Sequence, residues 1–400
     1  MTVEKVERAP GAPHQRAESI WNNPRYRAFF YQAVVVAAVV ALVWWLTANV
    51  MRNIAMVGRG VGFDFLDRVA GFAISFSLIA VDRSSTYLEI YFAGILNTLL
   101  VAVIGIVLAT IVGLVVGIAR LSPNWLIRKT AMVYVEIVRN VPLLLQLFFW
   151  YFAVLQAMPS VRDSIYLPLG LVLNLRGLYL PQPIPDDRFW IVAVAFAIGI
   201  VGFLAYRSYA RRLLEATGKR LPVVLPGLAL LVAAVAIAWL LSGTQMAFSF
   251  PELQGFNFAG GFSLPPELTA LLAGLVIYTS AFIAETVRAG IISVSHGQTE
   301  AAAALGLGEG DRLRLVILPQ ALRVIIPPLT SQYLNLTKNS SLGAAIGFPE
   351  LVSVFPGTTL NQTGRAIEVI ALTMLVYLTF SLITSMFMNW YNARVRLVER

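Results

Sequence analysis

The chain has 400 residues, of which 58% are hydrophobic and only 13% charged, and its formal net charge is +9. This composition excludes an ordinary soluble globular protein and predicts a membrane protein with several spans. There is no cysteine, which excludes disulfides and thiolate metal sites, and the only two histidines, His14 and His296, disfavour a metal centre.

Residues 1–28 are polar, contain three prolines and predict a mobile N-terminal tail. The first apolar run begins near Phe29. It is too long for the core of a signal peptide and has no small-residue cleavage site at its end, so it predicts a retained membrane anchor. Together with the polar segment that follows it, this anchor forms a predicted region at 29–90.

Apolar runs long enough to cross about 30 Å of hydrocarbon recur along the whole chain. Helices are expected because lipid offers the backbone no hydrogen-bond partners, and no barrel-like alternation is present. The prediction is an all-α polytopic membrane protein with about eight transmembrane helices. We place them near 29–51, 91–118, 131–158, 189–206, 222–241, 268–288, 322–346 and 367–390.

The positive charge is distributed as membrane topology requires, so no nucleic-acid partner is expected. Lysine and arginine accumulate in loops on the cytoplasmic side of membranes. An even number of spans with both termini in the cytoplasm places most of the basic residues on that side. The clusters lie at 5–27, 120–129, 207–220, 288–323 and 394–400.

Two features of the first half concern packing. A weakly amphipathic run from Phe63 to Ala80 predicts a segment lying along the membrane surface. In the second span a small residue recurs at every fourth position, which predicts a smooth helix face for close packing against another helix. These small residues are Gly105, Ala109, Gly113 and Gly117.

The third span carries polar groups near its start. Glu136 and Arg139 are three residues apart and can form an ion pair on one helix face, while Pro142 predicts a bend. Gln146 lies one turn beyond the proline. Two interpretations stay open: a bend supported by a salt bridge, or direct contact with a substrate.

A polar interruption at 285–319 separates two apolar runs. Glu285 and Arg288 predict an ion pair at the end of the sixth span. Ser295 with Gln298 fits a capping box, and strong helix formers follow from Thr299 to Leu305. Gly306 then predicts a left-handed helix end, Gly308 and Gly310 a loose turn, and Asp311 the cap of a second short helix.

The seventh span contains Pro327-Pro328, which predict a kink, and then a polar group in the middle of the membrane. A lysine at this depth is costly, so it should face a cavity or a partner. Pairing with a carboxylate across a subunit interface and contact with the carboxylate of a substrate are equally supported. The group consists of Lys338, Asn339, Ser340 and Ser341.

The interruption at 285–319 resembles the EAA signature of permease subunits of ABC importers. Glu300-Ala301-Ala302, then Gly306, and finally Leu318-Pro319 have the spacing of that signature, and only Val316 departs from it. The resemblance implies a cytoplasmic coupling helix that docks on an ATP-hydrolysing partner. The coupling residues it implies are Gly297, Glu300, Ala301, Ala302, Gly306, Leu318 and Pro319.

Two further stretches resemble the polar amino-acid permeases: the run from Arg139 to Gln146, and the run from Tyr278 to Gly290. The resemblance implies a type 1 transmembrane domain at 91–391 with a core of five spans. The first span, and the spans within 159–261, look like additions to that core. Within the family, the likeness is to the general L-amino-acid permease subunits of Gram-negative bacteria.

A transport subunit without enzymatic activity is therefore expected. The sequence has no nucleotide-binding G-x-x-x-x-G-K-[ST] loop and no catalytic arrangement. The resemblance implies that ATP and magnesium bind to partner ATPase subunits, in two copies, and that this chain binds no cofactor. It further implies a second related permease subunit, a periplasmic amino-acid-binding protein and the bacterial inner membrane.

The competing interpretation is a secondary transporter or channel driven by an ion gradient. Such a protein needs carboxylates inside the membrane for proton or sodium coupling. The acids near spans lie toward the span ends, which gives this interpretation weak support; they are Glu89, Glu136, Glu285 and Glu368. A pure scaffold explains neither Lys338 nor the signature at 285–319.

Overall fold

The computed structural model describes residues 24–57, 62–218 and 221–395, which belong to two compact units. The first unit, up to Asp64, contains a single long helix, α1 (Pro24–Val57), whose described side chains are mostly exposed. This helix covers the first predicted span. The predicted tail lies mainly outside the described residues, because α1 already begins at Pro24.

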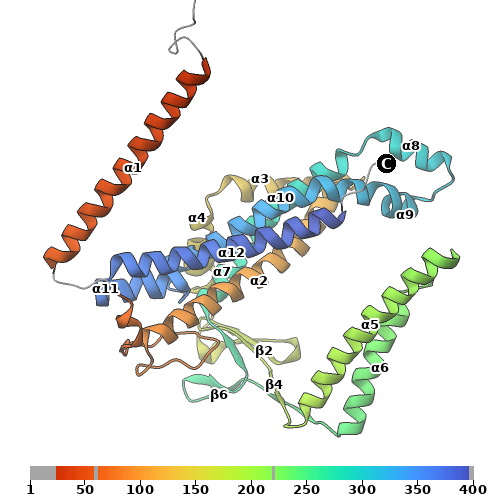
Figure 1. The fold of residues 1–400 in the computed structure, drawn as a ribbon. Coiled ribbons are helices and arrows are strands. Elements are labelled where there is room, and N and C mark those ends of the chain that lie inside the picture. The colour runs from red at the N-terminus through yellow and green to blue at the C-terminus, as the bar shows by residue number, and fades with distance from the viewer. Residues whose placement is uncertain (1–23, 58–61, 219–220, 396–400) are drawn as a thin grey trace, which may run out of the picture. The chain divides into compact units, whose positions relative to one another are not determined.

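The second unit contains the remaining helices (Figure 1). The described residues hold seven helices that are long and apolar enough to cross a membrane, and up to eight if one bent pair is counted as a span. The prediction of about eight spans is confirmed. The long helices of this unit are α2 (Tyr87–Ala119), α3 (Trp125–Asn140), α5 (Phe189–Thr217), α6 (Val224–Ser242), α7 (Pro266–Ile292), α10 (Leu318–Asn339) and α12 (Ala366–Val395).

The predicted third span is broken at Pro142. Helix α3 ends at Asn140, and α4 (Leu143–Phe148) starts after the proline and continues as a π-helical segment, Phe149–Leu155. The helix direction bends by 105° between the two arms. Pro142 has no N–H to continue the helix, which explains the break. The side chain of Gln146 is buried and donates to the carbonyls of Val138 and Val141, at 2.9 and 3.0 Å, and so holds the bend.

The core of the second unit is a bundle in which α2 packs along α7, and α10 packs against both α7 and α12. The predicted small-residue face of α2 is buried in this bundle. A Cβ on Gly113 would lie 2.6 Å from Cβ of Ile283, and one on Gly117 would lie 2.9 Å from the carbonyl oxygen of Ala284. Only glycine allows these backbones to come so close, so the stripe serves packing, as predicted.

The run from Phe63 to Ala80, which precedes α2, is mostly irregular and contributes buried side chains to the core. Its only helical turn is Asp64–Asp67, and Phe65, Ala70 and Phe76 are buried. Phe65 packs near Phe355, with ring centroids 6.4 Å apart, and Phe76 packs near Phe348 at 6.0 Å. The apolar side chains of this run therefore pack into the protein core, and its position along the membrane surface stays a prediction.

The block at 159–261, expected as a loop with two spans, also contains short strands, and one more strand follows it directly. They are β1 (Ile165–Leu167), β2 (Leu171–Asn174), β3 (Gly177–Leu180), β4 (Gln182–Pro185), β5 (Met246–Ser249), β6 (Glu252–Gln254), β7 (Asn257–Ala259) and β8 (Phe262–Leu264). All pair antiparallel, in the order β1-β2-β3-β8, with separate pairs β4-β5 and β6-β7. Helices α5 and α6 pack against each other between β4 and β5 in the chain.

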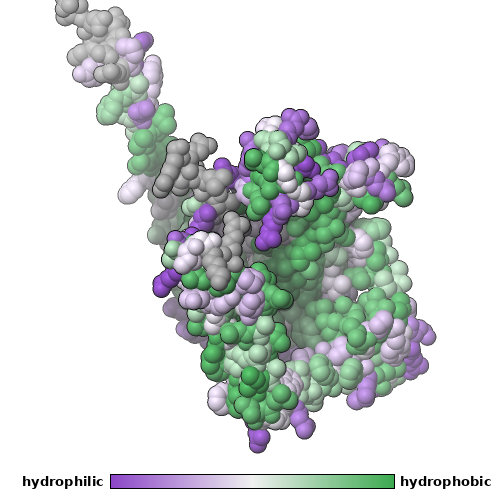
Figure 2. All heavy atoms as spheres, turned by 90° about the vertical axis from the view of Figure 1, so that its right-hand side faces the viewer, coloured by the Kyte–Doolittle hydropathy of each residue, from purple (hydrophilic) through white to green (hydrophobic). Residues whose placement is uncertain are grey.

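The surface agrees with a membrane location. Figure 2 shows broad hydrophobic surfaces over the helices, with hydrophilic residues gathered toward their ends. Many large apolar side chains on these helices are exposed, among them Leu241 at 83% and Leu225 at 78%. In water such surfaces would be unfavourable, whereas in a bilayer they face lipid.

Candidate functional site

Two short helices join α7 to α10 at the end of the bundle that lies opposite the strands (Figure 1). They are α8 (His296–Ala304) and α9 (Glu309–Arg312), and a π-helical turn, Leu313–Ile317, leads from α9 into α10. Two helices with a joint between them were predicted for this stretch, and this prediction is confirmed.

Helix α8 ends in a left-handed turn at Gly306, as predicted. Gly306 has φ of +77°, and its N–H donates to the carbonyl of Ala303 at 2.9 Å, while the N–H of Leu307 donates to Ala302 at 3.2 Å. This pair of bonds is a Schellman motif, which satisfies carbonyls that a helix end otherwise leaves open. A left-handed residue with a side chain costs about 1–2 kcal/mol, so glycine suits this position.

The predicted helix caps of this stretch are wrong in detail. Ser295 occupies the N-cap position of α8, but its side chain makes no capping hydrogen bond. The side chain of Gln298 instead accepts a bond from Gln320 at 3.2 Å, which ties α8 to the start of α10. The second helix is capped by Gly308, and Asp311 lies inside its first turn, where its charge still favours the helix N-terminus.

Most of the predicted coupling residues on α8 have small side chains and are accessible. Gly297, Glu300, Ala301 and Gly306 are exposed, and only Ala302 is buried. A Cβ added at Gly297 or Gly306 would meet no atom within 4 Å. Beside them Leu305 is 81% exposed. A second protein surface can therefore approach this helix closely.

The two remaining coupling residues lie at the start of α10. Leu318 is the first residue of that helix and Pro319 the second, a position where proline is common. Leu318 also lines an apolar cavity of about 890 Å³, together with residues from α2 and α7. The signature thus extends from the exposed helix α8 to the packed bundle.

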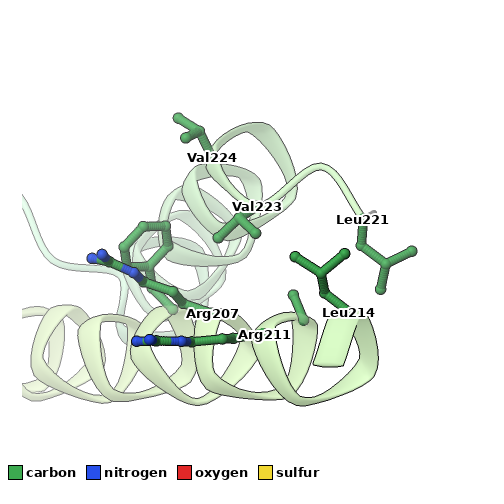
Figure 3. A pocket seen from close by; sticks show the side chains of 8 residues that line it. Arg207, Arg211, Leu214, Leu221, Val223 and Val224 are labelled. Atoms are coloured by element: carbon green, nitrogen blue, oxygen red, sulfur yellow. The ribbon is translucent and has the colours of Figure 1, made fainter. Parts of the chain in front are cut away.

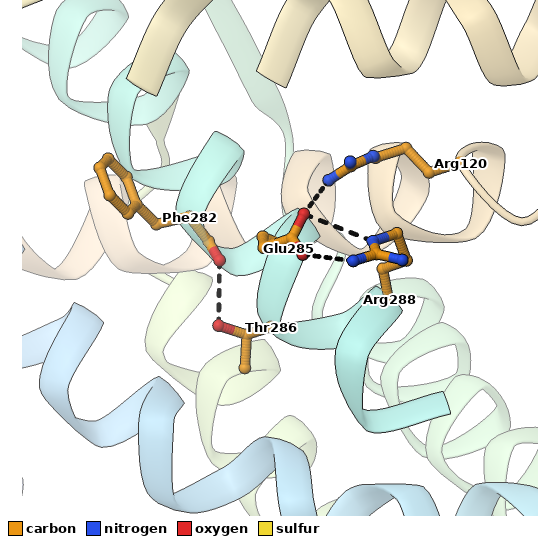
Figure 4. A network of polar contacts seen from close by, with 5 residues as sticks. All are labelled: Arg120, Phe282, Glu285, Thr286 and Arg288. Atoms are coloured by element: carbon orange, nitrogen blue, oxygen red, sulfur yellow. Dashed lines mark hydrogen bonds and ion pairs between the residues drawn. The ribbon is translucent and has the colours of Figure 1, made fainter. Parts of the chain in front are cut away.

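A charged cluster fixes the end of α7 just before α8 (Figure 4). Glu285 accepts from Arg288 at 2.6 Å through Oε1 and at 3.4 Å through Oε2, as its spacing predicted. Glu285 also pairs with Arg120, the residue that follows α2. The side chain of Arg120 is only 9% exposed, and a cation at a helix C-terminus is favourable. Sequence reasoning missed Arg120, which is 165 positions away in the chain.

The polar residues of α3 are arranged differently from the prediction. Glu136 and Arg139 are both exposed, and the described residues show no ion pair between them. The guanidinium of Arg139 lies instead over the ring of Phe282 on α7, 5.1 Å from its centroid. The prediction of an ion pair between Glu136 and Arg139 is therefore wrong. Both side chains remain accessible at the surface of α3.

Lys338 faces an open cavity, as predicted for a lysine at this depth. The cavity has a volume of about 490 Å³ and is lined mainly by α12, with Ser341 and Lys338 from the other side. Ser340 is buried and donates to the carbonyl of Thr337 at 2.7 Å, and Asn339 is the last residue of α10. No hydrogen bond or ion pair within the described ranges joins this group to Glu136 or Arg139.

Sequence reasoning also missed a buried acid near this cavity. Glu350 is fully buried and accepts the backbone N–H groups of Val352 and Ser353 at 2.8 and 2.7 Å. The hydroxyl of Tyr377, which lines the cavity of Lys338, donates to the same carboxyl at 3.1 Å. The dipeptide Pro349-Glu350 gives little sequence signal for such a role.

Residues 105–397 match the family described as "Binding-protein-dependent transport system inner membrane component". The chain belongs to this family. Members are inner-membrane components of transport systems, so this permease is a multi-pass membrane transport subunit rather than an enzyme.

Similar proteins extend over almost the whole permease. The "General L-amino acid transport system permease protein AapQ" of Rhizobium johnstonii is 48% identical over 100% of both chains. The "Putative amino-acid ABC transporter permease protein YhdX" of Escherichia coli is 49% identical over 94% of this chain and 96% of its own. The "Glutamate/glutamine/aspartate/asparagine transport system permease protein BztB" of Rhodobacter capsulatus is 40% identical over the same shares.

Proposed function

We propose that this permease carries L-amino acids across the bacterial inner membrane in an importer driven by ATP hydrolysis on separate subunits. The observation that carries the proposal is helix α8, an exposed helix of small residues that ends in a left-handed glycine. The amino-acid substrates named for three similar proteins agree with it. In this proposal ATP and magnesium bind to the partner ATPases and not to this chain.

The coupling step follows from how α8 is attached. On one side it continues from α7, whose end is held by the cluster of Glu285, Arg120 and Arg288. On the other side Gln298 contacts Gln320 at the start of α10. A push on α8 therefore reaches both α7 and α10, which pack against each other in the bundle. Movement of an ATPase surface can in this way be passed to the membrane helices.

The proposed assembly contains two ATPase subunits, a second related permease subunit and a periplasmic amino-acid-binding protein. Both termini lie in the cytoplasm, which puts α8 on the side where ATP is present. The basic residues support this orientation: Arg312 is the last residue of α9 and Arg314 lies in the π-helical turn after it, whereas acids and few bases surround the strands.

The substrate pathway is proposed to involve two groups. Glu136 and Arg139 are exposed on α3, and Lys338 with Ser341 borders the open cavity beside α12, while Asn339 follows Lys338 at the end of α10. Two further members of the proposed pathway, Gln146 and Ser340, are buried and act by fixing the backbone at the bend and at the end of α10. Lysine can bind the carboxylate that every amino acid carries.

The test is uptake of labelled amino acids into proteoliposomes that contain the complete transporter, its binding protein and internal ATP. Gly306→Asp puts a charge on the docking face of α8 and should abolish uptake, as should Glu300→Lys. The matched control is Gly255→Asp, because Gly255 has φ of +68° and open space around it but lies in the turn between β6 and β7. Uptake should continue in that control.

Normal uptake in both α8 variants would contradict the coupling role. Uptake by the purified chain alone, driven by an ion gradient, would favour a secondary transporter instead. In the same assay Lys338→Ala should weaken uptake several-fold or change the preference among amino acids. An unchanged preference and rate would assign Lys338 to structure alone.

A further inference from the structure

The hairpin of α5 and α6 contains a cavity that the transport function does not use. The cavity has a volume of about 650 Å³ and lies between the C-terminal part of α5 and the start of α6. Two arginines, Arg207 and Arg211, line it (Figure 3). The other lining side chains are apolar: Phe203, Ala210, Leu214, Leu221, Val223 and Val224.

The two arginines are arranged to meet one ligand. They are four residues apart on α5 and hence on the same helix face. Figure 3 shows their guanidinium groups extending in the same direction along the helix. Within the described part of the chain Arg207 has no carboxylate partner. Arg211 contacts Glu215 through Nε at 3.3 Å, but with side chains 81% and 66% exposed this pair is weak and open to exchange.

The cavity lies at the depth of lipid headgroups. The distance along α5 from Phe189 to Arg207 is about 27 Å at 1.5 Å per residue, close to the hydrocarbon thickness. At the other end of the hairpin the rings of Phe189 and Trp239 lie 6.5 Å apart, and Trp190 is exposed beside them. Aromatic residues mark one membrane interface, so the arginines lie at the other.

Direct contacts fix the walls of the cavity. Gly227 lets the two helices meet, since a Cβ there would come within 2.0 Å of the ring of Phe203. The hydroxyl of Tyr206 donates to the carbonyl of Pro222 at 3.2 Å and ties the end of α5 to the segment before α6. The site is therefore part of the packed hairpin.

We propose that this cavity binds an anionic phospholipid, with Arg207 and Arg211 on its phosphate and the apolar side chains against its acyl chains. Guanidinium groups match phosphate oxygens with paired hydrogen bonds, and basic pockets between membrane helices suit anionic headgroups. An acidic segment of a partner protein would satisfy the arginines but not the six apolar side chains. The lipid satisfies both.

The complete transporter, purified in mild detergent, is titrated with phosphatidylglycerol or phosphatidylcholine, and native mass spectrometry counts the bound lipid. Phosphatidylglycerol should bind more tightly than phosphatidylcholine. Arg207→Gln and Arg211→Gln should each weaken phosphatidylglycerol binding about fivefold, the factor expected for one arginine near an anionic headgroup. Arg212→Gln is the matched control, because Arg212 is exposed beside the cavity without lining it, and should leave binding unchanged.

Equal binding of the two lipids would overturn the proposal, and so would an equal loss in Arg207→Gln and Arg212→Gln, which would indicate diffuse charge attraction. Displacement of the lipid by inorganic phosphate alone would also contradict it. If Arg207→Gln removed a protein subunit from the assembly without changing lipid binding, the arginines would belong to a protein contact. None of these measurements depends on transport activity.

Discussion

Helix α7 and the hairpin of α5 and α6 are all long enough to cross a membrane, but their side chains are distributed differently. Most of α7 is buried among other helices, although it is the least apolar of the three. The helices of the hairpin are more apolar and mostly exposed. In a membrane, lipid selects for large apolar side chains, whereas contact between helices selects for small and polar ones. Among these three helices, burial in the core and hydropathy therefore run in opposite directions.

Ion pairs in the two regions offer the sharpest way to test this contrast. Glu285→Gln removes the carboxylate that Arg120 and Arg288 share, and leaves the nearly buried guanidinium of Arg120 without its charge partner. Since Glu285 itself is 26% exposed, we expect a loss of about 2–3 kcal/mol in the free energy of unfolding, below the value for a fully buried pair. Chemical denaturation of the purified transporter measures it.

The hairpin supplies the control for that change. Glu215→Gln removes the partner of Arg211, but both side chains are largely exposed, so stability should change by less than about 0.5 kcal/mol. Equal losses in the two variants would show that the cluster at Glu285 is no better shielded from solvent than the pair on the hairpin. They would also contradict the role of this cluster in holding the end of α7.

Glycines at helix contacts give the second comparison. Gly113→Ala places a methyl group 2.6 Å from Cβ of Ile283 and 2.9 Å from the carbonyl of Ser280, neither of which can turn away. We expect a loss of about 1–2 kcal/mol. Gly202→Ala on α5 meets only the end of the Leu230 side chain, which can rotate, and its stability should stay within about 0.5 kcal/mol of the parent. Thermal unfolding compares them, and similar melting temperatures would contradict tight packing of α2 on α7.

The smallest expected effect concerns helix caps. Thr86 and Glu89 form a complete capping box at the start of α2, with bonds of 3.3 and 2.8 Å, whereas Ser295 makes no such bond. Thr86→Ala should therefore cost about 1 kcal/mol, and Ser295→Ala close to nothing. Hydrogen exchange of the first turn of each helix reports this difference. Faster hydrogen exchange in the first turn of α8 in Ser295→Ala would contradict this expectation. It would indicate that Ser295 caps the helix, as the sequence predicted.

The sequence predicts the spans well because lipid imposes a long apolar run on every helix that crosses it. It also predicts the left-handed helix end at Gly306, because such a turn depends on the local residue type. It predicts less where contacts between distant segments of the chain determine the structure. Phe65 and Phe76 belong to a run whose weak amphipathic pattern predicts a segment along the membrane surface, but their side chains are buried near Phe355 and Phe348.

The candidate site shows the same limit. The pairing of Glu285 with Arg288 follows from their spacing, whereas Arg120 comes from another helix and carries no local signal. Arg139 lies over an aromatic ring on α7 and does not pair with Glu136. Residue spacing alone does not predict this contact. The strands β1 to β8 escape prediction because each has only three or four residues, too few for a clear alternation.

The pairing of β3 with β8 has a consequence for how this protein can be rebuilt. Leu180 and Phe262 lie directly opposite each other, so the chain between them, including α5 and α6, starts and ends at neighbouring points. Inside that excursion β4 and β5 also pair, which brings the chain back together a second time next to the two helices. The hairpin of α5 and α6 is thus inserted at one point of the fold: we expect a short turn from Pro185 to Met246, which lie opposite each other, to replace it and leave Phe258 packed near Tyr179.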